Sequence, residues 1–176
     1  MTRIDGGKEG DEEKLTENRP LEMIICTGSP GSGKSTFTKR FLKDYVRINN
    51  DEYKTKEKCA KMAAQFLKEG KSVVIDNTNP KRELRSLYLK IAKDLKVPAR
   101  SVYFDTPKEV CIHNNEQRGT NPHHDHASKM VPMIALHMFF KNVQTPLLSE
   151  GFESIIKVNF LADLFDNKQD EEHYNM

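Results

Sequence analysis

Short apolar runs alternate with amphipathic stretches along most of this 176-residue chain. Runs such as Met23–Thr27 and Ser72–Ile75 are rich in Ile and Val, which is typical of buried strands in a parallel sheet. Between the runs, apolar residues recur with the spacing of an amphipathic helix. The pattern predicts strands at residues 23–27, 45–49, 72–75, 101–104 and 154–158. Helices are predicted at about residues 34–43, 54–69, 81–96, 107–117 and 130–141.

This alternation predicts an α/β fold: a central parallel β-sheet of about five strands with helices on both faces. Ligands of such sheets bind outside the carboxyl ends of the strands. Gly28, residues 49–51, residues 76–79 and Asp105 each follow a predicted strand directly. We therefore expect the polar residues that carry the chemistry to meet at one edge of the sheet.

The two ends of the chain differ from its middle. Residues 1–20 are polar and lack hydrophobic periodicity, so we interpret them as a flexible tail or linker. Residues 163–176 read as an acidic C-terminal tail, which leaves residues 21–162 as one domain. No apolar stretch is long enough for a secretory signal or a membrane span. The three cysteines are widely spaced, which indicates a reducing, intracellular compartment.

The net charge of +2 conceals an uneven distribution. Residues 23–162 hold 23 basic and 14 acidic residues, a net of +9, between two acidic ends. This charge indicates a polyanionic partner such as nucleic acid. A solvated, lysine-rich surface without such a partner would give the same net charge.

One motif has a specific physical meaning. Residues 28–35 match GxxxxGK[ST], the phosphate-binding loop, between a predicted strand and a predicted helix. The glycines let successive backbone N–H groups point at an anion, and the helix adds the positive end of its dipole. Lys34 would reach the β- and γ-phosphates of ATP, and the Ser35 hydroxyl would bind Mg²⁺. The residues expected to hold the nucleotide are Gly28, Ser29, Pro30, Gly31, Ser32, Gly33, Lys34 and Ser35.

Three other segments favour a kinase. Asp51 follows the second strand, where a carboxylate could accept a proton from a substrate hydroxyl; the alternative is that it caps the next helix. Asp76 follows the third strand, a position suited to Mg²⁺ or substrate, while Thr78 or Asn79 could simply cap the following helix. Arg118 ends a helix before a polar segment typical of a mobile lid. Residues 167–170 match NKxD, the motif with which GTPases recognise guanine. They follow no predicted strand, so a GTPase is not favoured.

Basic residues accompany these positions. Lys54, Lys58 and Lys61 share one predicted helical face directly after Asp51. Arg82 and Arg85 begin the helix after Asp76. Both groups could line a groove for the phosphates of a nucleic acid, or could only keep amphipathic helices in water.

The segments GSPGSGKST, INNDEY, VVIDNTNP, HNNEQRGT and TPLLSEGFESIIKVNF together resemble the kinase domain of polynucleotide kinase/phosphatase. The resemblance covers about residues 22–160 and implies a P-loop kinase fold with a helical lid. It implies transfer of the ATP γ-phosphate to a 5′-hydroxyl end of DNA or RNA, in nucleic-acid end repair in the nucleus. By motif, Lys34, Ser35 and Thr36 would bind phosphates and Mg²⁺, and Asp51 would be the general base. Asp76, Asn77 and Thr78 would face the substrate, and Arg118 would be the lid arginine.

Two departures from that family stand out. It often has N-R-D where this chain has Asn49-Asn50-Asp51, and its lid often carries more arginines than Arg118. The phosphatase signature DxDxT is absent, so kinase activity alone is expected, with a phosphatase domain on a longer natural chain.

The competing interpretations are a small-molecule or nucleoside kinase of the same fold, and a nucleic-acid-binding module that uses ATP as a switch.

Overall fold

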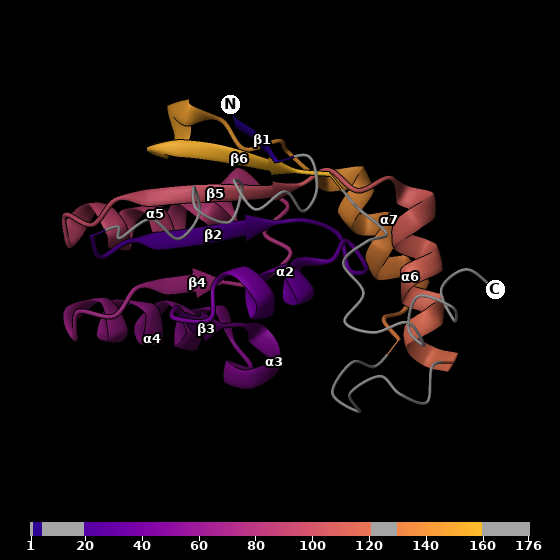
Figure 1. Ribbon diagram of the computed structural model, residues 1–176, viewed down its shortest axis with the longest axis horizontal. Helices are drawn as coiled ribbons and strands as arrows, with labels where there is room; N and C mark the ends of the chain where they lie inside the picture. Colours follow the sequence, from indigo (N-terminus) through magenta and orange to yellow (C-terminus); the bar gives the residue numbers. More distant parts are fainter. Residues whose placement is uncertain (1, 5–19, 121–129, 160–176) are drawn as a thin grey trace.

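All five predicted strands form, and they lie side by side in one parallel sheet (Figure 1). The computed structural model describes residues 2–4, 20–120 and 130–159. The predicted strands are β2 (Met23–Thr27), β3 (Val46–Ile48), β4 (Val73–Ile75), β5 (Ala99–Phe104) and β6 (Ser154–Val158). The sheet order is β1-β6-β5-β2-β4-β3. The predicted α/β architecture is thus confirmed.

The sixth strand was not predicted. β1 (Thr2–Ile4) pairs in parallel with the edge of β6, so the prediction of a flexible tail over residues 1–20 is wrong for these three residues. An edge strand presents unpaired N–H and C=O groups to which a short segment can add, and this cannot be read from a polar sequence. Residues 5–19 and the predicted acidic tail at 163–176 lie outside the described residues.

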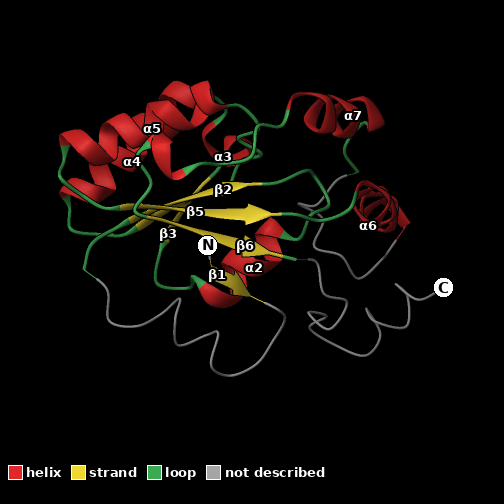
Figure 2. Cartoon of the chain, turned by 90° about the horizontal axis from the view of Figure 1, so that it is seen from above, coloured by secondary structure: helices red, strands yellow, loops and turns green. Residues whose placement is uncertain are grey.

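Helices cover both faces of the sheet (Figure 2). Side chains alternate along each strand, so Met23 and Ile25 pack towards α4 (Lys56–Lys68) and α5 (Arg82–Asp94), while Ile24 and Cys26 pack towards α2 (Lys34–Phe41). The short helix α3 (Asn50–Tyr53), which was not predicted, precedes α4. The chain also forms α6 (Lys108–Thr120), α7 (Met133–Asn142) and a 3₁₀ turn, η1 (Leu148–Glu150).

Helices α6 and α7 lie beyond the carboxyl ends of the strands (Figure 1). The loop between β2 and α2, the start of α3 and the segment after β4 leave the sheet at this same edge. The predicted lid segment at residues 121–129 joins α6 to α7 and lies outside the described residues. The fold therefore brings the predicted site residues to one edge of the sheet, next to helices α6 and α7.

Candidate active site

The phosphate loop has the backbone that its glycines predict. Gly31 and Gly33 have φ angles of 79° and 90°, in the left-handed region that favours glycine. A Cβ atom at Gly31 would lie 2.3 Å from the carbonyl oxygen of Cys111 on α6. The loop is thus shaped by local backbone and by close contact with α6, and α2 begins directly after Gly33.

The ammonium group of Lys34 lies inside this loop. Its Nζ donates to the carbonyl oxygens of Gly28 (2.9 Å) and Ser29 (2.7 Å), and the residue is 8% exposed. Burial lowers the pKa of Lys34 to about 8, while the nearby Asp76 carboxylate acts in the opposite direction. At neutral pH the loop therefore holds a partly desolvated positive charge, as a phosphate site requires.

Asp76 lies beside Ser35 at the carboxyl end of β4. The Ser35 and Thr38 hydroxyls donate to Asp76 Oδ2 at 3.2 and 3.4 Å. The Asp76 side chain is 1% exposed, and its other oxygen, Oδ1, has no hydrogen-bond partner among the described residues. A buried, incompletely satisfied carboxylate next to a hydroxyl fits Mg²⁺, which takes oxygen ligands. Asp76, which we expected on the substrate side, thus lies at the predicted metal ligand Ser35.

Arg47, which sequence reasoning missed, completes this network. From β3, its Nε and Nη2 each lie 2.6 Å from Asp76 Oδ2, and Nη2 donates to Ser35 Oγ at 3.0 Å. The available signal was an arginine within an otherwise apolar strand segment, where a charge needs a partner.

Asp51 lies on α3 with its side chain exposed. The helix cap is Asn49, whose side-chain oxygen accepts from the backbone N–H of Glu52 at 2.9 Å. The alternative was that Asp51 caps the next predicted helix, at residues 54–69. That helix, α4, is capped by Thr55, whose side-chain oxygen accepts from the backbone N–H of Lys58 at 3.2 Å, so the alternative is wrong. Asp51 remains available for other contacts at the ligand edge.

Arg118 extends from α6 towards the same place. Burial lowers its pKa, and the negative charges of Asp76 and Asp51 act in the opposite direction. Arg118 in turn helps lower the pKa of Lys34. Arg118 is thus within electrostatic reach of Lys34, Asp76 and Asp51.

Asn77 and Thr78 act on the backbone of neighbouring elements. Asn77 Oδ1 accepts from the N–H of Asn50 at 2.8 Å, and the Thr78 carbonyl accepts from the N–H of Gly28 at 3.1 Å. Asn79, not singled out as a site residue, has φ of 41° and donates to the Cys26 carbonyl at 2.8 Å. The segment after β4 thus ties the phosphate loop to α3.

The two arginines that were predicted to line a groove, Arg82 and Arg85, have different surroundings. Arg82 is exposed, with Nε 3.8 Å from Glu150 Oε1. Arg85 is 0% exposed and makes a two-pronged contact with Glu150, Nε to Oε2 at 2.8 Å and Nη2 to Oε1 at 2.7 Å. Its Nη1 donates to the carbonyls of Asn79 and Pro80. The expectation that Arg85 contacts substrate is therefore wrong, because its guanidinium is buried and fully engaged.

The remaining predicted residues are partly or fully exposed. Pro30 is half-buried in the loop, and Thr36 is exposed in the first turn of α2. Lys54 is exposed, but it lies between α3 and α4, so the prediction that it shares one helical face with Lys58 and Lys61 is wrong. Its ammonium donates to the backbone carbonyl of Asp51. Lys58 and Lys61 are exposed on α4 as expected.

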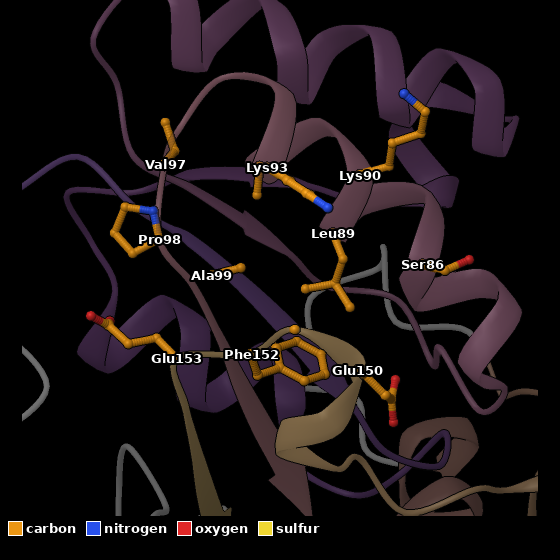
Figure 3. Close-up of a pocket in the computed structure, with 12 residues that line it drawn as sticks. Ser86, Leu89, Lys90, Lys93, Val97, Pro98, Ala99, Glu150, Phe152 and Glu153 are labelled. Atoms are coloured by element: carbon orange, nitrogen blue, oxygen red, sulfur yellow. The ribbon is translucent and has the colours of Figure 1, made fainter.

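A separate cavity of about 640 Å³ lies between α5 and the segment from η1 to β6 (Figure 3). Leu89, Ala99 and Phe152 line it, together with charged residues such as Lys93 and Glu153. It includes none of the predicted site residues, and it lies near the amino ends of β5 and β6. The cavity is therefore not part of the phosphate site.

Within the described ranges, no group of three or more His, Cys, Asp or Glu side chains could hold a metal ion. Over the same residues, no helix has both the length and the apolar content needed to cross a membrane.

The sequence profile of the AAA domain family matches residues 23–139. The chain belongs to this family. In this AAA domain, the match begins at β2 and ends within α7, so it covers the phosphate loop, Asp51, Asp76 and Arg118.

Two curated relatives extend this similarity. The chain is 39% identical over 141 residues to a bifunctional polynucleotide phosphatase/kinase of Schizosaccharomyces pombe, covering 79% of the chain and 34% of the relative. It is 40% identical over 151 residues to a putative bifunctional polynucleotide phosphatase/kinase of Acanthamoeba polyphaga mimivirus, covering 82% and 35%. This AAA domain thus spans about a third of the length of these relatives.

Solved structures with the same fold include Chaetomium thermophilum Kti12 in complex with ADP-AlF3, with a TM-score of 0.64, 15% identity and coverage of 87% of this chain and 95% of that one. The Mycobacterium tuberculosis APS kinase CysC, in complex with AMPPNP and APS, has a TM-score of 0.52 and 16% identity, with coverage of 89% and 95%. At these identities the likeness establishes the P-loop fold of the AAA domain alone.

Proposed function

We propose that this chain is an ATP-dependent polynucleotide 5′-hydroxyl kinase. The observation that carries the proposal is that the segment after β4 joins the phosphate loop to α3: Asp76 accepts from the Ser35 hydroxyl at 3.2 Å, and Asn77 accepts from the backbone N–H of Asn50, next to Asp51, at 2.8 Å. This arrangement supports a carboxylate base close to a phosphoryl donor site. The names of the relatives at 39% and 40% identity support a polynucleotide as the acceptor.

The proposed reaction is one displacement at phosphorus. The 5′-oxygen of the acceptor forms a bond to the γ-phosphorus of ATP, the bond from that phosphorus to the β–γ bridging oxygen breaks, and ADP leaves. Asp51 orients the hydroxyl and takes its proton. Lys34 and Arg118 stabilise the negative charge that moves between the oxygens. Ser35 and Asp76 would hold Mg²⁺, which neutralises phosphate charge when bound.

The acceptor side is basic. Exposed Lys54, Lys58 and Lys61 lie on or beside α4, whose first turn is at the ligand edge. These side chains are suited to phosphates that flank the reacting end of a strand. A free nucleoside has no phosphates for these lysines to contact, so the lysines favour a polynucleotide acceptor over a free nucleoside.

The test is transfer of labelled γ-phosphate from ATP to 5′-hydroxyl DNA and RNA oligonucleotides and to a panel of free nucleosides. We expect transfer to oligonucleotides, with an apparent affinity that falls with salt at a log–log slope of about −0.7 per phosphate contact. Transfer to nucleosides with equal efficiency would instead identify a small-molecule kinase. ATP hydrolysis without any acceptor product would identify an ATP switch.

Charge reversal separates the acceptor groove from general surface charge. Lys54→Glu and Lys58→Glu should raise KM for the oligonucleotide and leave KM for ATP nearly unchanged. Lys68→Glu is the matched control, because Lys68 is exposed at the opposite end of α4. An equal effect of all three changes would mean that only net charge matters.

The relatives' names also support a phosphatase domain on a longer natural chain. A role in the repair of nucleic-acid ends stays a prediction of the proposed reaction. A nuclear location follows from that role as a prediction. Imaging of the tagged full-length protein would test it.

A further inference from the structure

Arg47 lies on β3, at one edge of the sheet, and its charged side chain contacts two residues of the phosphate site. Its guanidinium bridges Asp76 Oδ2 (Nε and Nη2, both 2.6 Å) and Ser35 Oγ (Nη2, 3.0 Å). The Asp76 side chain is 1% exposed and that of Arg47 34% exposed. A buried carboxylate is thus neutralised by a cation that has one side towards solvent.

The two groups that Arg47 joins are the same two that would hold Mg²⁺. A divalent cation needs oxygen lone pairs directed at it, whereas Arg47 directs N–H donors at Ser35 Oγ and Asp76 Oδ2. Two positive groups on one carboxylate also repel each other. Arg47 in this position and a cation bound between Ser35 and Asp76 are therefore in competition.

We propose that Arg47 is the resident counter-ion of the metal position: it neutralises Asp76 before ligand binds and is displaced when Mg²⁺ binds with the nucleotide. This inference rests on the proposed nucleotide site. Arg47 supplies the buried Asp76 carboxylate with the positively charged partner that a buried carboxylate needs. The partial exposure of Arg47 gives the displaced guanidinium a route away from the carboxylate.

The measurement is the Mg²⁺ enhancement of ADP binding, defined as the ADP Kd with EDTA divided by the ADP Kd with saturating Mg²⁺, by calorimetry. No turnover is involved. In Arg47→Gln the competitor is gone, so the enhancement should rise about ten-fold over wild type, the scale of one partly exposed unit charge. Arg47→Lys should lie between the two, because a point charge lacks the fork that spans both partners. Lys43→Gln, an exposed charge change after α2, is the matched control and should leave the enhancement unchanged.

An enhancement that is equal or smaller in Arg47→Gln would overturn the proposal. Should that variant not fold, the wild type supplies a second readout, the hydrogen exchange of the Arg47 Nε–H measured by NMR. We expect this proton to be protected without metal and to exchange faster once Mg²⁺ and ADP bind. Continued protection in the Mg²⁺–ADP complex would also overturn the displacement.

The two proposals fail separately. A protein that binds Mg²⁺–ADP and shows the Arg47 effect, but phosphorylates no oligonucleotide, would refute the acceptor alone. A protein that phosphorylates oligonucleotides with an unchanged enhancement in Arg47→Gln would refute the counter-ion alone. Absence of any ADP binding by the wild type would refute both.

Discussion

The side-chain amide of Asn114 donates a hydrogen bond of 2.8 Å to the carbonyl oxygen of Gly31, which ties helix α6 directly to the phosphate loop. Arg118 lies four residues later on α6, so Asn114 and Arg118 share one face of the helix. Next to it, Asn115 is fully buried and pairs with the backbone N–H and C=O of Val131, just before α7. Two adjacent amides thus set the position of α6 against both the loop and the next helix.

This relationship predicts that Asn114→Ala lowers kcat more than it raises KM for ATP. Loss of the anchor would let α6 shift and carry Arg118 away from the transferring phosphate. Stability should fall by only about 1 kcal/mol, the usual contribution of one hydrogen bond. Asn114→Gln should recover part of kcat. Glu116→Ala, an exposed change on the same helix, is the control; if it lowered kcat as much, general damage to α6 would be the cause.

Arg118 itself should matter mainly in the transition state. Arg118→Ala is expected to lower kcat by about 10³–10⁵, as arginines in this role do in other phosphotransferases. Arg118→Lys should restore only part, because an ammonium lacks the planar fork. Full kcat in the alanine variant, measured with saturating ATP and oligonucleotide, would show that Arg118 has no part in transfer.

The lowered pKa of Lys34 predicts how nucleotide binding depends on pH. Its pKa is lowered to about 8 by burial, and bound phosphate favours the protonated form, so binding above that pH must take up a proton. The ADP affinity should therefore be nearly constant up to about pH 7.5 and fall as the pH rises beyond 8. Calorimetry in buffers of different ionisation enthalpy measures the uptake directly.

Two variants of Lys34 check the origin of this effect. Lys34→Ala should bind ADP weakly at every pH, without proton uptake. Lys34→Arg should lose the fall above pH 8, because a guanidinium stays protonated throughout this range. Persistence of the same fall in both variants would assign it to another group.

Asp51 and Asn49 separate catalysis from helix capping. Asp51→Asn keeps the shape but cannot accept the proton, so oligonucleotide phosphorylation should drop by about 10²–10⁴. ADP binding and thermal stability should stay near wild type, because Asn49 caps α3. The matched change Asn49→Ala should show loss of stability, by about 1 kcal/mol. Turnover near wild type in Asp51→Asn would leave Asp76 as the next base to test.

Arg82 and Arg85, three residues apart, should behave in opposite ways. Arg85→Met removes the two-pronged partner of the buried Glu150 carboxylate and leaves it the more distant Arg82, 3.8 Å away, so the free energy of unfolding should fall by about 3–5 kcal/mol. Replacing Glu150 by Gln in that background should recover part of the loss. Arg82→Gln should leave stability nearly unchanged and raise KM for the oligonucleotide. Denaturant unfolding of the four proteins decides between structure and binding.

The strands and most helices could be predicted because their signals are local. Side-chain alternation in residues 23–27 and the apolar stripe of residues 54–69 depend on neighbours in the chain. α3 was missed because its four residues show no periodicity, and β1 because a three-residue edge strand depends on its partner β6.

The sequence by itself determined that a phosphate loop is present, since the glycine spacing and the helix that follows are local signals, whereas the packing of the loop against α6 depends on the tertiary structure. It also determined which polar segments reach the ligand edge, because parallel strands all end there. Only the tertiary structure decided which charges face outward. Arg85 is buried because Glu150, 65 residues away, meets it; Arg47 is paired because Asp76, 29 residues away, lies beside it. A charged side chain is stable inside a protein only with a partner, and that partner is chosen by the packing of distant segments.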